Sequence, residues 1–159
     1  MPVGRRSAAA GLFLAMRGRK MALDNPFDFT GKTVLLAGAT GGLGHPVTLA
    51  FARAGANIAG CARNREALDK LAAELKGSSG GILMDKVDLC DEKQVVGFVD
   101  NTRKRFGRID VLVTLVGNII RKPSVDYSLD EWQQVMDANL KACWLPCQSV
   151  GRGIIAQKS

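Results

Sequence analysis

The stretch Thr33-Val-Leu-Leu-Ala-Gly38-Ala-Thr-Gly-Gly-Leu-Gly44 contains the pattern that decides the fold. Four apolar residues, Val34 to Ala37, form a run that is too short for a helix and apolar enough for a buried strand. The glycines that follow have the spacing G-x-x-x-G-x-G, and apolar residues at helical spacing begin after Gly44. The sequence therefore predicts a strand, a glycine-rich turn and a helix.

This glycine-rich turn has the features of a phosphate-binding site. Glycine lets the backbone turn sharply and lets a ligand approach without a Cβ atom in the way. The start of the following helix presents unpaired N–H groups and the positive end of the helix dipole, where a pyrophosphate would bind. Glycines also occur in ordinary loops, so a purely structural turn is the alternative. The position of the glycines between a strand and a helix favours dinucleotide binding.

Length and composition indicate one globular domain. The chain has 159 residues, of which 47% are apolar, which is enough for a hydrophobic core. The longest apolar run, Val111 to Ile120, has about half the length that a membrane span requires. The sequence therefore predicts no membrane-spanning segment.

The formal net charge of +7 is concentrated at the start of the chain. The first 23 residues hold five of the 22 basic side chains and no acidic one, so 17 basic and 15 acidic side chains remain. A nearly neutral body disfavours a nucleic-acid-binding face. We expect residues 1–22 to be a basic, disordered extension, although an organelle transit peptide would have the same composition. Residues 23–159 are the predicted domain.

The four cysteines do not form a metal-binding motif. Cys61, Cys90, Cys143 and Cys147 include no C-x-x-C pair, and the one histidine, His45, is distant in sequence. Cys143 and Cys147 lie one helical turn apart, but two thiolates alone do not make a zinc site. Free thiols in a reducing compartment are the simpler interpretation, which favours a cytoplasmic location and no bound metal.

Strands and helices alternate along the rest of the domain. This order predicts an α/β fold of Rossmann type, a doubly wound parallel sheet with helices on both faces. Ligands of such sheets bind at the carboxyl ends of the strands. The fourth strand is strongly apolar, so we expect it to be central. The expected strands are 33–38, 57–61, 82–87 and 109–116. The expected helices are 43–54, 91–106 and 129–157, and a further helix begins after its capping residue Asn64.

Residues at two positions after these strands are candidates for recognising the adenosine part of the cofactor. An NAD site would have a carboxylate about 20 residues after the glycines, where this chain has Ala62 and Arg63. An arginine there suits a 2′-phosphate, which favours NADP over NAD, although Arg63 could instead be solvated or stack on adenine. Asp88 could accept a hydrogen bond from the adenine amine while Leu89 packs on the ring. The alternative for Asp88 is a helix cap.

The order of these motifs resembles the short-chain dehydrogenase/reductase family. Residues 37–44 are similar to its T-G-x-x-x-G-[IL]-G motif, residues 109–117 to its L-V-N-N-A-G stretch, and residues 132–140 to its helix with the active-site Asn. The resemblance implies an oxidoreductase that transfers hydride between NAD(P)(H) and an alcohol or ketone, and a homo-oligomer of the complete chain. Residues 27–32 and 118–123 resemble the sugar-acid dehydrogenases in particular. The cofactor-binding residues predicted from pattern and resemblance together are Gly38, Thr40, Gly41, Gly42, Leu43, Gly44, Arg63, Asp88, Leu89 and Gly117.

The resemblance carries over one catalytic residue, Asn139, for which a helix Asn with a local backbone bond is the alternative. The family's catalytic Ser and Tyr-x-x-x-Lys follow the next strand, beyond Ser159. Tyr127 has Glu131 four residues later instead of lysine, so we expect a packing or surface residue. The chain is therefore expected to be the cofactor-binding half of such an enzyme, truncated after the fourth strand and the following helix. A non-catalytic NADP-binding module and a decayed copy are the alternatives.

Two departures from the family concern the fourth strand and the last helix. Thr114, Leu115 and Val116 stand where the family has Asn-Asn-Ala, which leaves the local geometry open. Pro146 lies inside the expected last helix and should kink or break it. An open edge on the fourth strand and an exposed apolar helix surface would make the isolated chain unstable or self-associating. The helix side chains expected to be exposed are Trp144, Leu145 and Ile154.

Overall fold

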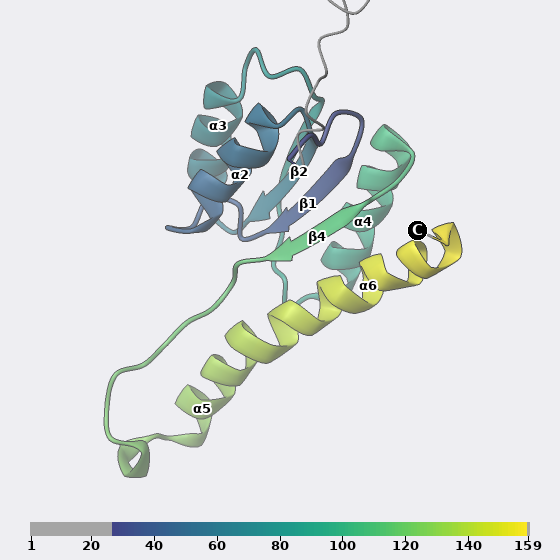
Figure 1. The fold of residues 1–159 in the computed structure, drawn as a ribbon. Coiled ribbons are helices and arrows are strands. Elements are labelled where there is room, and N and C mark those ends of the chain that lie inside the picture. The colour runs from purple at the N-terminus through teal and green to yellow at the C-terminus, as the bar shows by residue number, and fades with distance from the viewer. Residues whose placement is uncertain (1–26, 159) are drawn as a thin grey trace, which may run out of the picture.

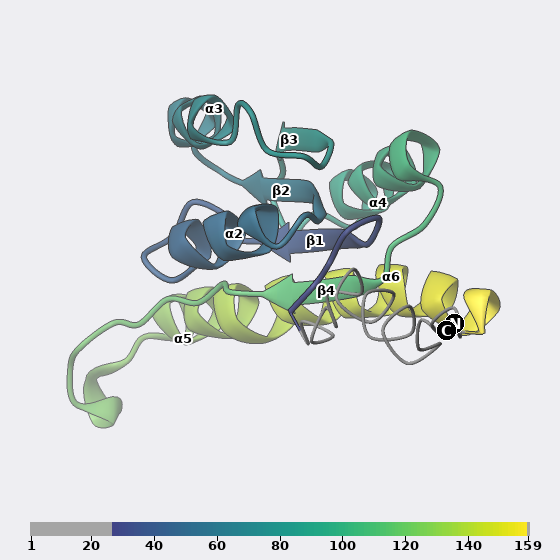
Figure 2. The same cartoon turned by 45° about the horizontal axis from the view of Figure 1, so that its top comes forward.

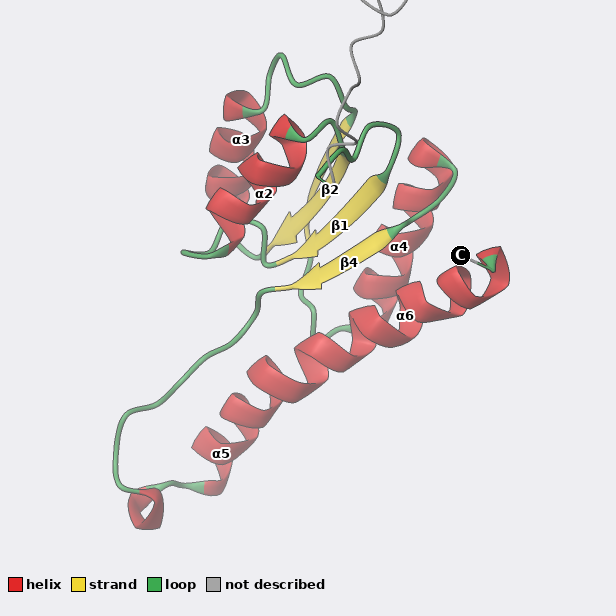
Figure 3. Ribbon diagram, in the orientation of Figure 1, coloured by secondary structure: helices red, strands yellow, loops and turns green. Residues whose placement is uncertain are grey.

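A computed structural model of the protein describes residues 27–158, and the predicted extension 1–22 lies outside them. Strands and helices alternate as the sequence predicts (Figure 1, Figure 3). The strands are β1 (Thr33–Ala37), β2 (Asn57–Ala62), β3 (Ile82–Lys86) and β4 (Val111–Thr114). The helices are α2 (Gly44–Arg53), α3 (Arg65–Glu74), α4 (Glu92–Phe106), the 3-10 turn η1 (Ser124–Asp126), α5 (Leu129–Met136), the π-helical η2 (Asp137–Lys141) and α6 (Ala142–Gln157).

The four strands form one parallel sheet with the order β3-β2-β1-β4. In its register, Leu35 of β1 lies between Ala59 of β2 and Leu112 of β4. This is the beginning of the doubly wound Rossmann order, so the predicted fold class is confirmed.

Helices cover both faces of the sheet, with α2 and α3 on one side and α4 and α6 on the other (Figure 1, Figure 2). The side chains of β1 alternate between the two layers. Val34 and Leu36 are buried against α2 and α3, whereas Leu35 and Ala37 are buried in the core that α4 and α6 complete. A strand covered on both faces must be apolar at every position, which is why residues 34–37 form a continuous apolar run.

Within the described residues, strand β4 pairs with β1 and forms the open edge that is expected for this chain. Its residues are only half-buried. The apolar sequence of β4 agrees with the cover on both faces of the strand. Val111 and Val113 pack on the core under α2 and α3, and Leu112 packs on the opposite core.

The last helical segment runs continuously through α5, η2 and α6, and Pro146 does not break it. The irregularity lies one turn earlier, in η2, where the Ala142 N–H group donates to the Asp137 carbonyl with the wider spacing of a π-helix. Leu145 is buried and Ile154 packs against the core, so their predicted exposure is wrong, whereas Trp144 is 54% exposed. No helix in the described part of the chain is long and apolar enough to cross a bilayer.

A buried carboxylate joins β1 and β4 at the end of the sheet where these strands begin. The Asp110 side chain is only 8% exposed and accepts a hydrogen bond from the Thr33 backbone N–H group at 2.9 Å. Arg108 lies 2.7 Å from the same carboxylate, and Lys32 lies 3.8 Å from it. Asp110 therefore satisfies a buried N–H donor and is itself neutralised by two cations.

We predict that Asp110→Ala lowers the free energy of unfolding by about 1–2 kcal/mol, because the buried Thr33 N–H group loses its acceptor. Urea denaturation measures the change. Asp100→Ala is the matched control, because Asp100 is 53% exposed and its ion pair with Arg103 lies on the surface of α4. Equal destabilisation by the two variants would contradict a structural role for Asp110.

Candidate dinucleotide-binding site

The carboxyl ends of all four strands border one cavity of about 300 Å³. The predicted residues Gly38, Thr40 and Gly41 line it from the turn after β1. Arg63, Asp88, Leu89 and Gly117 line it from the segments after β2, β3 and β4. The structure therefore brings together seven of the ten predicted cofactor-binding residues.

The three other predicted residues, Gly42, Leu43 and Gly44, do not line this cavity. They continue the turn toward α2, and Leu43 is 72% exposed. Leu43 is also the N-cap residue of α2 and supplies no side-chain acceptor to the first N–H groups of the helix. The His45 N–H group donates to the Gly41 carbonyl at 2.9 Å, the Val47 N–H group donates to the Leu43 carbonyl at 3.2 Å, and Pro46 has no N–H group. In the first turn of α2, the Gly44 N–H group is therefore the donor left for solvent or for an anion among the described residues.

Gly44 is required for the shape of the turn. A Cβ atom on Gly44 would lie 1.9 Å from the Gly38 carbonyl oxygen and 2.9 Å from the Ala39 carbonyl carbon. Gly38 itself has a φ of 88°, which favours glycine. The buried Thr48 hydroxyl donates to the Gly44 carbonyl at 2.7 Å and holds the first turn of α2. Because Gly38 and Gly44 have no side chain, the backbones of β1, the turn and α2 can pack directly against each other.

Arg63 is exposed at the rim of the cavity, and its guanidinium has no ion pair within residues 27–158. By contrast, the nearby Arg65 pairs with Asp69 at 3.3 Å and with Asp85 at 3.8 Å. Arg63 is therefore a cation beside the cavity whose charge no carboxylate of the described residues neutralises.

Asp88 has a fixed orientation at the cavity and does not cap α4. One oxygen of its carboxylate accepts the Cys90 backbone N–H group at 2.9 Å, and the Asp88 N–H group donates to the Gln94 side chain. The N-cap of α4 is Asp91, which accepts from the N–H groups of Lys93 and Gln94. Hydrogen bonds from Gln94 hold the pKa of Asp91 below its usual range. The helix-cap alternative for Asp88 is therefore wrong.

Asn139 lies in η2 and attaches the loop after β4 to the long helix. Its side-chain amide donates to the carbonyl oxygens of Asn118 and Val135, both at 2.7 Å, and its oxygen accepts the Asn118 N–H group at 3.3 Å. The same oxygen lies 2.9 Å from the place where a Cβ atom of Gly117 would be. Asn139 therefore both makes the local helix bond and positions Gly117 at the cavity.

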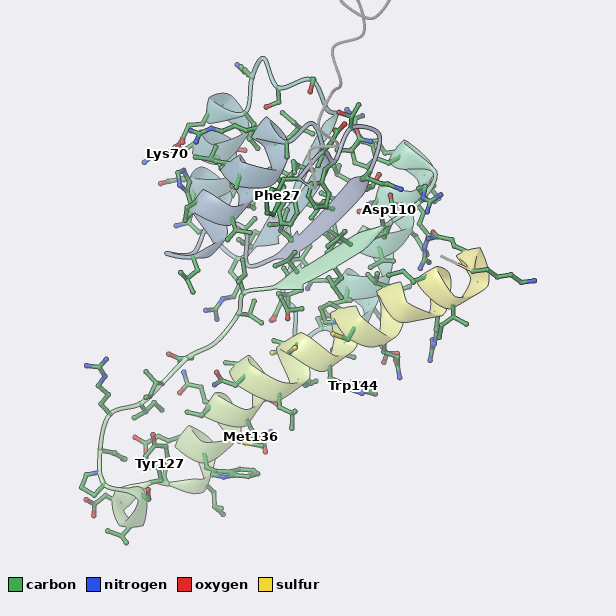
Figure 4. The ribbon with its side chains drawn as sticks, viewed as in Figure 1. Phe27, Lys70, Asp110, Tyr127, Met136 and Trp144 are labelled. Carbon is green, nitrogen blue, oxygen red and sulfur yellow. The ribbon has the colours of Figure 1, made fainter. Side chains whose placement is uncertain are left out.

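Tyr127 lies in the projecting loop before α5, away from the strand ends (Figure 4). Its hydroxyl donates to the Ile120 carbonyl, and Lys122 lies over its ring. The predicted capping box of Ser128 and Glu131 is present. The Lys122 ammonium, 2.5 Å away, and the Ser128 N–H group lower the pKa of Glu131 from 4.5 to about 2. Tyr127 is thus a half-buried packing residue, as its sequence context predicts.

Several cavity residues were not predicted from the sequence. Most of these residues are adjacent in sequence to predicted ones, so their position at the same strand ends could have identified them. Ala138 and Ala142 give no such signal, since they come from the long helix and reach the cavity only through tertiary packing. The cavity residues outside the predicted cofactor contacts are Asn64, Val87, Cys90, Leu115, Ala138 and Ala142, together with Ala62 and Val116, which the sequence places at the strand ends.

Comparisons with known proteins agree with this geometry. The family profile described as short chain dehydrogenase matches residues 32–159. D-threitol dehydrogenase of Mycolicibacterium smegmatis is 33% identical over 139 residues, which are 87% of this chain and 54% of that protein. The short chain dehydrogenase/reductase dpchG of Colletotrichum higginsianum is 39% identical over 119 residues, which are 74% of this chain and 44% of that protein.

Solved structures show the same similarity in three dimensions. A short-chain type dehydrogenase/reductase from Mycobacterium marinum has a TM-score of 0.78 and 35% sequence identity over 82% of this chain and 53% of its own. A second crystal structure, of a protein from Sinorhizobium meliloti, has a TM-score of 0.76 and 28% identity over 82% of this chain and 52% of its own. The chain thus spans about half the length of these relatives.

Proposed function

The chain belongs to the short-chain dehydrogenase/reductase family, and on that basis we propose that it binds NADP or NAD for hydride transfer to or from an alcohol or ketone. The observation that carries this proposal is the cavity at the carboxyl ends of all four strands, next to a turn that Gly38 and Gly44 keep free of side chains. A diphosphate accepts hydrogen bonds from such a turn, and the helix dipole of α2 favours its charge.

The cofactor that suits the residues of this site best is NADP. In our proposal, the Arg63 guanidinium binds the 2′-phosphate, because it is a cation at the rim with no carboxylate partner in residues 27–158. The Asp88 carboxylate accepts from the adenine amine, and Leu89 packs on the ring. NAD remains the alternative cofactor, since both share the diphosphate and the adenine.

The substrate class that we propose is a small alcohol rich in hydroxyl groups, such as a polyol or a sugar acid. The name of the Mycolicibacterium smegmatis relative, D-threitol dehydrogenase, supports a polyol, and the resemblance of residues 118–123 supports a sugar acid. The nicotinamide supplies the hydride chemistry when it is bound. Asn139 holds the loop after β4 and thereby positions Gly117 at the cavity. A homo-oligomeric state and a cytoplasmic location stay predictions.

Isothermal titration calorimetry of the chain with NADPH tests the proposed function. We expect one NADPH per chain, and we expect adenosine 2′,5′-bisphosphate to compete for the same site, because the proposed contacts are with the adenosine half and the diphosphate. Circular dichroism on the same sample confirms that it is folded. A folded sample that takes up neither NADPH nor NADH would contradict the proposal.

A further inference from the structure

Two thiols lie next to each other on α6, outside the dinucleotide cavity. Cys143 and Cys147 are four residues apart, a spacing that makes side chains neighbours on a helix surface. Cys147 is exposed and Cys143 is half-buried. The two cysteines are therefore neighbours on the surface of α6, and the pair is open to solvent at Cys147.

A hydroxyl on the neighbouring strand supports this pair. The Thr114 Oγ1 atom, at the end of β4, lies 3.4 Å from the Cys143 Sγ atom. A hydroxyl can rotate to accept from a thiol or to donate to a thiolate. The Thr114 side chain therefore turns toward α6. The hydroxyl is therefore placed to stabilise negative charge on Cys143.

A cysteine binds a metal ion as the thiolate, so binding releases the proton of the thiol. A hard cation gains little from two protonated thiols, whereas a soft cation binds sulfur strongly enough to release the protons.

We propose that Cys143 and Cys147 form a dithiol site for a soft, two-coordinate cation such as Cu(I). In the binding step both thiols lose their protons to solvent, and two S–Cu bonds form with no change in oxidation state. No group of three or more His, Cys, Asp or Glu side chains occurs in residues 27–158, so the pair lacks the further ligands that Zn²⁺ requires. The number of donors therefore favours an ion that two thiolates satisfy.

An anaerobic titration with Cu(I), in competition with bicinchoninate, tests the site. We expect the chain to withdraw one equivalent of Cu(I) from the chelator. Cys143→Ser and Cys147→Ser should each weaken binding at least about 100-fold, and Thr114→Val should weaken it about tenfold. Cys90→Ser is the matched control, because Cys90 is also half-buried but lies after β3, and it should bind Cu(I) like the wild type.

Alkylation of the wild-type chain gives a second result that does not depend on the folding of a variant. Iodoacetamide labelling with mass spectrometry should show that Cu(I) protects Cys143 and Cys147. Cys61 is an internal reference, since burial raises the pKa of its thiol to about 12 and it should react slowly with or without copper. Undiminished binding by Cys147→Ser, loss of binding in Cys90→Ser, or protection of Cys90 in place of the pair would overturn the proposal.

Discussion

Replacing Gly44 with alanine is expected to abolish dinucleotide binding and to lower the free energy of unfolding by about 3 kcal/mol. The added Cβ atom would lie 1.9 Å from the Gly38 carbonyl oxygen, a distance at which the backbone itself must move. No flexible side chain can yield there, because the atoms in contact belong to the turn. Urea denaturation measures the loss of stability, and calorimetry with NADPH measures the loss of binding.

Gly42→Ala is the matched control within the same motif. Beyond Gly42 itself and its two chain neighbours, no atom lies within 4 Å of the place where its Cβ would be, and Gly42 is not among the described residues with positive φ. Its free energy of unfolding should therefore stay within about 0.5 kcal/mol of the wild-type value. Similar destabilisation by the two substitutions would mean that the turn does not have the backbone packing described here.

Replacing Arg63 with alanine is expected to raise the Kd for NADPH roughly 10–100-fold and to change the Kd for NADH less than about threefold. The guanidinium would lose charge-assisted hydrogen bonds to a 2′-phosphate that NADH lacks. Calorimetric titration of both cofactors on both proteins measures the difference. The Arg63 side chain is exposed, so we expect Arg63→Ala to change the preference for NADPH over NADH without affecting the fold.

Arg65→Ala removes the same charge two residues later and serves as the control. The Arg65 side chain is already paired with Asp69 and Asp85, and it does not line the cavity. We expect both affinities to stay close to those of the wild type. An equal loss of NADPH and NADH binding in Arg63→Ala would show that Arg63 contacts a part common to both cofactors, such as adenine.

The sequence predicts most of the fold because the local patterns agree with the tertiary structure. The run from Val34 to Ala37 is apolar at every position, and the structure covers both of its faces. Asn64 caps α3 through its side chain, and the Ser128 capping box begins α5, as the sequence indicates. These signals are local, so they can be read without knowledge of the packing.

The errors arise where distant packing decides the outcome. Both faces of β4 are covered, and an apolar sequence alone does not tell whether a strand lies in the middle of a sheet or at its edge. Leu145 was expected to be exposed, but α6 turns it into the core beside α4. The sequence predicts that Pro146 kinks or breaks the helix, but the change in helical spacing occurs in η2, before the proline.

The candidate site shows the same division between local and distant determinants. The glycine turn, Arg63 and Asp88 each follow a strand, so topology alone places them at one edge of the sheet. Ala138 and Ala142 complete the wall of the cavity from the long helix, whose position depends on packing across the sheet. Small apolar residues in a helix carry no sign of such a role.

The central claim is that the turn between β1 and α2 binds a diphosphate through its backbone N–H groups. Titration of the ¹⁵N-labelled chain with NADPH, followed by NMR, tests it most directly. We expect the largest amide shifts at Thr40, Gly41, Gly42 and Gly44, with smaller shifts at Arg63 and Leu89. A folded chain whose spectrum does not change, or whose shifts lie on surfaces away from this turn, would contradict the claim.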